Sequence, residues 1–284
     1  MKTSFAWQGI RMTISTRWHP LELEGTFSSG YALLVDLHGP RMAIRWATPR
    51  GKTIKPIERI RKAMLQEVGR LAAEEARILT TPEMECGLLY TEAALPGRDV
   101  WIGWSPTSGR MIQIIYHAHR RDRILEKLIL PTLVDEATQA TVPWAVFDLN
   151  CRIPREYRLG SRQLNAGDLN LWFESGNQRL RVRQIAMADL ALKRRPLAMW
   201  LQADQRLQSR NYRPKGDTVA ISAQKSLGTL RRRRRFFFAW KLPRTLTTIA
   251  HHDVPRDRLI IVQGSNPSTV MQATDSMNSH TERS

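Results

Sequence analysis

Residues that commonly define a structural class are scarce in this sequence. Only two cysteines occur, Cys86 and Cys151, and neither has a partner at Cys-x-x-Cys spacing. A disulfide framework is therefore not indicated, and both residues are expected to be reduced and apolar in character. No stretch approaches the roughly 20 apolar residues that span a bilayer, so we expect no membrane insertion. The start of the chain lacks the apolar core of a signal peptide, which favours a cytoplasmic location.

Motifs of common enzyme classes are also missing. The sequence contains no nucleophile elbow, no phosphate-binding glycine loop and no Cys–His arrangement. His117 and His119 stand two residues apart, and no third ligand follows them at a suitable spacing. His251, His252 and Asp253 form a loop cluster that is equally weak evidence for a metal site. The sequence therefore assigns no catalytic, cofactor-binding or metal-binding residue, and no small-molecule ligand is inferred.

Acidic residues are few in the second half of the chain. Residues 1–143 hold 19 Lys and Arg against 15 Asp and Glu, whereas residues 144–284 hold 25 against 11. The net charge is therefore +4 in the first half and +14 in the second, out of +18 for the whole chain. A strongly basic half attracts polyanions through long-range electrostatics, whether these are nucleic acids, anionic membranes or acidic proteins.

The chain contains an internal repeat. With an offset of 137 residues, the aligned pairs include Trp7 with Trp144, Ile10 with Phe147, Met12 with Leu149, Gly30 with Gly167 and Gly39 with Gly176. After one inserted residue the offset becomes 138, and the pairs include Arg41 with Arg179, Met42 with Leu180 and Ile44 with Val182. Two later pairs are Trp104 with Trp240 and Ile112 with Ile260. The order and apolar alternation of these pairs indicate two tandem copies of one domain, over 1–142 and 143–266.

Each copy is predicted to contain three opening strands, a helix and three closing strands. In the first copy the expected elements are strands over 8–15, 30–36 and 41–46, a helix over 54–78, and strands over 84–92, 99–105 and 110–117. In the second copy they are strands over 145–153, 167–173 and 179–185, a helical run over 187–207 broken near Pro196, and strands over 217–223, 234–241 and 257–263. A further helix over 121–137 is expected in the first copy only, and a disordered polar tail over 267–284.

This order of elements predicts the α+β class, with two tandem copies of an antiparallel-sheet domain and one or two packed helices in each. The Ile-Pro-x-x-Tyr-x-Leu run from Ile153 to Leu159, with Trp18-His19-Pro20-Leu21 as its counterpart, resembles the opening of a Mog1/PsbP-like α/β/α domain. The resemblance covers the order of elements over most of both copies. It implies a protein-binding or accessory role and not an enzyme, by analogy of fold.

Arginines supply the candidate binding residues of the second copy. The run Arg231–Arg235 precedes three phenylalanines, and it is either a phosphate clamp beside stacking aromatics or a solvated strand entry. Alternate arginines over 179–183 share one face of a strand, and a further pair follows at 194–195. The complete set is Arg179, Arg181, Arg183, Arg194, Arg195, Arg231, Arg232, Arg233, Arg234 and Arg235.

Three functions are compatible with these features. We favour a non-enzymatic binding or accessory protein that presents the basic face of its second domain to an acidic protein partner within an assembly. The alternative is sequence-independent binding of RNA or DNA by the same domain. A second, less favoured alternative is an enzyme with a site between the two repeats. No cofactor is implied by any of the three.

Overall fold

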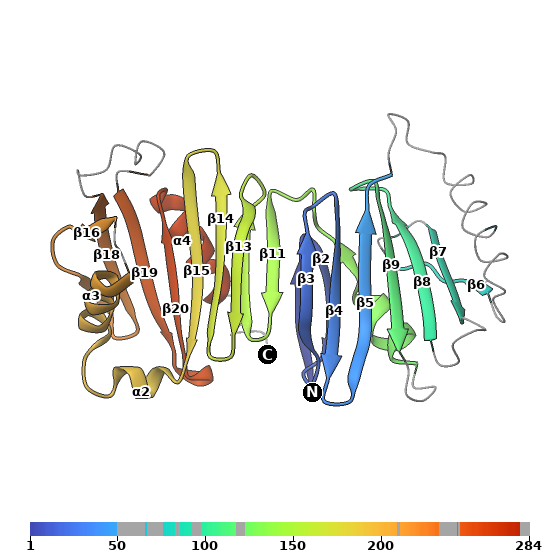
Figure 1. Cartoon of the computed structure of the whole chain (residues 1–284), viewed down its shortest axis with the longest axis horizontal. Coiled ribbons are helices and arrows are strands. Elements are labelled where there is room, and N and C mark those ends of the chain that lie inside the picture. Colours follow the sequence, from blue (N-terminus) through green and yellow to red (C-terminus); the bar gives the residue numbers. More distant parts are fainter. Residues whose placement is uncertain are drawn as a thin grey trace. The chain divides into compact units, whose positions relative to one another are not determined.

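The computed structural model describes residues 1–49, 66, 76–82, 84, 86–91, 98–117, 123–208, 211–232, 243 and 245–278. The chain forms two compact units, Met1–Asn150 and Cys151–Ser284, and each is described by itself. Strands contain 58% of the described residues and helices 18%. The expected α+β class is therefore wrong, because the fold consists mainly of antiparallel strands with few and short helices (Figure 1).

Unit 1 contains a seven-stranded antiparallel sheet and a smaller sheet that begins at the N-terminus. The larger sheet has the spatial order β3 (His19–Gly25), β4 (Ser29–Asp36), β5 (Gly39–Ala47), β9 (Arg110–His117), β8 (Arg98–Ser105), β7 (Cys86–Thr91) and β6 (Ala76–Ile78). The smaller sheet has the order β10 (Val134–Asp135), β2 (Ile10–Ser15), β1 (Lys2–Trp7), β11 (Thr141–Val146) and β12 (Leu149–Pro154), and β12 continues past the end of unit 1 at Asn150. Between β9 and β10 the chain forms two short helical turns, η1 (Leu125–Ile129) and η2 (Leu130–Thr132).

Unit 2 is built on an eight-stranded antiparallel sheet. Its order is β13 (Arg158–Asn165), β14 (Asp168–Ser175), β15 (Gln178–Ala186), β20 (Arg258–Gly264), β19 (Thr245–Asp253), β18 (Lys225–Arg232) and β16 (Tyr212–Pro214), and β17 (Val219–Ser222) also pairs with β18. Its helices are α2 (Ala188–Leu192), α3 (Leu197–Gln208), α4 (Pro267–Asn278) and the short turn η4 (Val254–Arg256). Among the helices that the structure describes, none is long and apolar enough to cross a membrane.

Helices α3 and α4 cover the sheet of unit 2. Leu197 and Leu201 of α3 pack on Ala250, Leu259 and Ile261 of the sheet. Helix α4 packs along β19 and β20, and its buried residues are Val270, Ala273 and Met277. Each helix buries one short apolar face against the sheet, which is the usual way in which a helix stabilises a sheet surface.

The two large sheets have the same strand order, as a duplicated domain predicts. The register agrees as well. Trp46 of β5 pairs with Ile112 of β9, and Gln184 of β15 pairs with Ile260 of β20. Trp46 and Gln184 are related by the offset of 138, and Ile112 and Ile260 are a pair that the sequence aligned. The sequence comparison thus identified equivalent strands in the middle of each copy.

The offset of 137 at the start of the repeat is wrong by two residues. The β1–β2 turn has a positive φ of 50° at Gln8, and the β11–β12 turn has a φ of 53° at Phe147, which gives an offset of 139. Ala6 is then equivalent to Ala145, and these two residues pair with each other across β1 and β11. The error arises because apolar alternation has a period of two, so a shift by two residues leaves the pattern unchanged.

Several predicted elements also differ from the structure. The helix expected over 121–137 is reduced to the turns of η1 and η2, because Pro131 removes a backbone donor, and β10 follows. The tail expected to be disordered over 267–284 contains α4 from Pro267 to Asn278. Helix α4 follows β20 in the chain, just as η1 and η2 follow the equivalent strand β9 in unit 1. The helix expected over 54–78 falls largely outside the described residues, although β6 shows that 76–78 is a strand, and the strand expected over 234–241 lies wholly outside them. Trp240, the predicted counterpart of Trp104, also lies outside the described residues. The register aligns β8, which contains Trp104, with β19.

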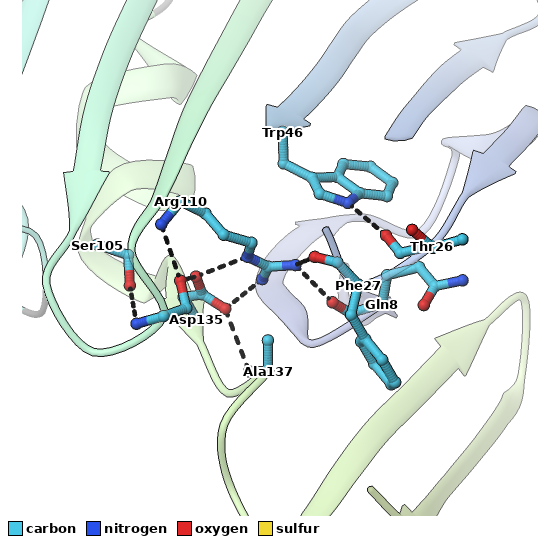
Figure 2. Close-up of polar contacts among 9 residues, drawn as sticks. Gln8, Thr26, Phe27, Trp46, Ser105, Arg110, Asp135 and Ala137 are labelled. Atoms are coloured by element: carbon cyan, nitrogen blue, oxygen red, sulfur yellow. Dashed lines mark hydrogen bonds and ion pairs between the residues drawn. The ribbon is translucent and has the colours of Figure 1, made fainter. Parts of the chain in front are cut away.

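A buried arginine ties the two sheets of unit 1 together. The guanidinium of Arg110 on β9 donates from Nε to Asp135 Oδ2 at 3.0 Å and from Nη2 to Asp135 Oδ1. Its Nη1 donates to the carbonyl oxygens of Gln8 at 2.9 Å and Phe27 at 2.8 Å (Figure 2). Arg110 and Asp135 have side chains that are only 2% and 1% exposed. A buried charge needs such complete pairing, because an unpaired one costs several kcal/mol of desolvation.

Candidate binding surfaces of unit 2

The three strand arginines share one face of the sheet, as the alternation predicted, but their surroundings differ. Arg179 is exposed, and its Nε lies 3.7 Å from Glu174 Oε1. Arg181 is half-buried, donates to Asn170 Oδ1 from Nε at 2.9 Å, and lies 5.3 Å from the centre of the Trp172 ring. Burial lowers the pKa of Arg181, with the neighbouring guanidinium of Arg183 as a smaller cause. Arg179 and Arg181 therefore place positive charge on this face.

Arg183 holds α3 to the sheet. Its guanidinium makes a bidentate pair with Asp168, with Nε–Oδ1 and Nη2–Oδ2 distances of 2.8 Å, and Nη1 donates to Asp204 Oδ1 of α3 at 3.0 Å. The hydrogen bonds from Arg183 lower the pKa of Asp168. Burial raises the pKa of Asp204 despite the same neighbour. Arg183 is thus a structural tie between β14, β15 and α3, and most of its charge is compensated.

A pocket of about 420 Å³ lies on the same face, between the sheet and the end of α3; we call it the sheet pocket. Its polar lining includes Arg179, Arg181, Asp204 and Gln205, and its apolar lining includes Leu230, Leu246 and Ile261. Trp172 and Tyr212 supply aromatic rings. Burial raises the pKa of Tyr212, whose hydroxyl donates to the carbonyl oxygen of Pro243 at 3.0 Å. The volume and the mixture of apolar and polar groups are those of a small-molecule site.

A second hollow, of about 680 Å³, lies along α2 and α3; we call it the α2–α3 groove. Apolar side chains line most of it, namely Leu190, Ala191, Trp200, Ala203 and Leu207. Three cationic residues from the α2–α3 connection also line it, namely Lys193, Arg194 and Arg195, and Asp204 of α3 adds one carboxylate. The three cationic residues lie between the end of α2 at Leu192 and the start of α3 at Leu197, outside either helix. Pro196 favours this break, because its ring disfavours a helical conformation at the preceding residue.

Several of these groove residues differ from their expected placement. Leu190 and Leu207 belong to the apolar run that the sequence assigned to a helix, and such a run normally packs inward. In the structure their exposed fractions are 68% and 86%. Both residues therefore contribute apolar surface next to positive charge, a combination that the sequence pattern alone did not reveal.

The arginine run is only partly described. Arg231 and Arg232 end β18, where Arg231 is exposed and Arg232 is half-buried. They pair with Arg213 and Tyr212 of β16. Arg233, Arg234 and Arg235 lie outside the described residues. The structure therefore does not bring the described part of this run into the α2–α3 groove.

Three potential metal ligands meet at the start of α2. Asp189, His252 and Asp257 each place one ligand atom within 4.8 Å of the others. Asp257 Oδ1 accepts a hydrogen bond from the backbone N–H of Asp189 at 2.7 Å, which caps the first turn of α2. His252 Nε2 lies 3.3 Å from Asp189 Oδ1. Capping and this contact account for the cluster, which sequence reasoning missed because Asp189 and Asp257 are 68 residues apart in the chain.

Cys151 is unsuited to nucleophilic chemistry. Cys151 is a free, fully buried thiol, and burial raises its pKa to about 12. Since the thiolate is the reactive form, this residue is inert at neutral pH. No protein-family model and no curated protein matches the chain. The function is therefore inferred from the surfaces of unit 2.

Proposed function

We propose that the chain is a non-enzymatic binding protein whose second unit captures an acidic, partly apolar segment of a protein partner in the α2–α3 groove. The observation that carries this proposal is the exposed apolar lining of the groove beside Lys193, Arg194 and Arg195. We also propose that this occurs in the cytoplasm and within a larger assembly.

The apolar lining favours a protein partner over a nucleic acid. Exposed apolar surface beside polar residues is characteristic of protein–protein contacts, and helices or extended segments commonly dock in such grooves. Phosphate contacts require cations but gain nothing from the exposed side chains of Leu190 and Leu207. Trp200 adds an aromatic residue, a type that often dominates the binding energy of interfaces. Nucleic-acid binding is accordingly retained as the second candidate, supported by the exposed Arg231 at the end of β18.

The charge of the second half supports an acidic partner. Residues 144–284 carry a net charge of +14, and complementary charge speeds encounter and excludes basic competitors. Charged rim residues mainly affect association rate and salt dependence, whereas the apolar centre supports residence. The groove combines both elements within unit 2.

Neutralising the three cationic residues of the α2–α3 groove should abolish binding of the partner. In nuclease-treated extracts of the native cells, the tagged wild-type chain should retain a specific protein, and the Lys193→Gln/Arg194→Gln/Arg195→Gln variant should retain at least tenfold less of it. The matched control is Arg155→Gln/Arg158→Gln/Arg162→Gln, which removes the same charge from exposed positions that line neither hollow.

Equal loss in both variants would show that net charge, and not the groove, holds the partner. Retained material that disappears on nuclease treatment would instead support the nucleic-acid alternative. In that case binding to a labelled single-stranded oligonucleotide should weaken steeply between about 50 and 200 mM salt.

A further inference from the structure

The sheet pocket is distinct from the α2–α3 groove, and among the lining residues named above only Asp204 belongs to both. The groove lies along the helices, whereas the sheet pocket reaches the strand residues Leu230, Leu246 and Thr248. Its volume of about 420 Å³ falls in the range of pockets that hold small organic ligands. A function of this pocket does not depend on the proposed partner.

Gln205 supplies the most informative group of the sheet pocket. This residue of α3 lines the pocket and is only 3% exposed, yet its side-chain Nε2 has no hydrogen-bond acceptor within the described part of the chain. Buried amide donors are nearly always paired in folded proteins, so this one calls for an acceptor that the described residues do not supply. A ligand with an oxygen acceptor satisfies that requirement.

The neighbouring strand is shaped around the same amide. A Cβ atom at Gly228 of β18 would lie 2.7 Å from Gln205 Nε2, closer than real contacts allow, and 3.0 Å from its Oε1. The glycine therefore makes room for the amide group beside the sheet. Any larger residue at 228 would displace the only unsatisfied buried donor among the described groups that line the pocket.

The remaining lining indicates the chemistry of a ligand. Arg179 and Arg181 place guanidinium groups at the pocket, and guanidinium groups recognise carboxylates with good geometry. Two carboxylates, Asp204 and Glu174, also line the pocket. Arg183 Nη1 lies 3.0 Å from Asp204 Oδ1 and offsets its charge, whereas Glu174 is exposed and its Oε1 lies 3.7 Å from Arg179 Nε. Leu230 and Leu246 provide an apolar wall.

We propose that the sheet pocket binds a small carboxylic acid with an apolar body. The carboxylate lies at the guanidinium groups of Arg179 and Arg181, an oxygen of the ligand accepts from Gln205 Nε2, and the apolar body packs on Leu230 and Leu246. This is a non-covalent site within unit 2, and its ligand is one that the sequence did not predict.

Six-carbon probes test this chemistry directly. In calorimetric titrations of the full chain, hexanoate should bind saturably, and hexan-1-ol and hexylamine should bind at least tenfold more weakly, because only hexanoate offers a carboxylate. No saturable binding of hexanoate, or equal binding of all three probes, would overturn the proposal.

Variants distinguish a ligand contact from a purely structural amide. Gln205→Leu removes the donor at similar size, and Gly228→Ala moves it; each should weaken hexanoate binding about tenfold. Gln205→Leu should leave the melting temperature of the free protein unchanged or higher, because an unpaired donor is removed. The groove variant Lys193→Gln should retain full hexanoate affinity. A lower melting temperature for Gln205→Leu with unchanged hexanoate affinity would show a structural role and contradict the proposal.

Discussion

Replacing Arg110 with methionine should lower the free energy of unfolding of unit 1 by about 3–5 kcal/mol, because the carboxyl group of Asp135 is then buried without its partner. The substitution also leaves the carbonyl oxygens of Gln8 and Phe27 without the Nη1 donor (Figure 2). Urea unfolding followed by tryptophan fluorescence measures this loss. In a chain of two compact units the shift should appear in the transition of unit 1 and leave that of unit 2 in place.

The matched control for this prediction is Arg17→Met, which removes one exposed arginine from the same unit. It should change stability by less than about 0.5 kcal/mol. A similarly small effect of Arg110→Met would contradict the view that this guanidinium holds the sheets of unit 1 together.

Arg183→Gln should lower the free energy of unfolding of unit 2 by about 2–3 kcal/mol at neutral pH. The expected loss is smaller than for Arg110 because the Asp168 side chain is about one third exposed and solvent screens its charge. The substitution leaves Asp168 and Asp204 facing each other across the contact of α3 with the sheet. Urea unfolding at several pH values measures the effect, and Arg206→Gln on the exposed side of α3 is the control.

The pH dependence of this variant has a definite sign. In the wild-type protein Arg183 lowers the pKa of Asp168. The stabilisation by this ion pair is therefore present above the pKa of Asp168 in the unfolded chain and is lost as the pH falls through its pKa in the folded protein. Without Arg183 the folded pKa values of both carboxyl groups rise, which favours the folded variant at low pH. The stability difference between variant and wild type should therefore shrink as the pH falls from 7 towards 4. A constant difference would show that charge is not the cause.

The fold was predictable where apolar alternation and turn chemistry agree. The alignment of Ile112 with Ile260 matched equivalent strands, because both lie in central strands that are buried on the sheet. The fold class was not predictable in the same way. Strand β18 was missed because its alternation, Leu227 to Leu230, contains Gly228 and runs into the arginines. Helix α4 was missed because its apolar residues are separated by Ser, Thr and Gln.

The candidate site was predictable only in part. Alternation correctly placed Arg179, Arg181 and Arg183 on one face, but it contained no information on Asp168 and Asp204, which neutralise Arg183 in the structure. Composition identified the basic half, whereas the exposure of Leu190 and Leu207 depends on how far α2 and α3 extend over the sheet. No local signal identifies Gln205, since a buried unpaired amide is a property of tertiary packing.

Site-specific photo-crosslinking tests the central claim that unit 2 holds an acidic protein partner in the α2–α3 groove. A photoreactive residue at Leu207, which is 86% exposed in the groove, is compared in native cells with one at Leu37, which is 96% exposed in unit 1. We expect a nuclease-resistant adduct with a protein bearing an acidic segment at position 207 only, and we expect its loss in the Lys193→Gln/Arg194→Gln/Arg195→Gln variant. Nuclease-sensitive adducts at position 207, or the same adducts at both positions, would contradict it.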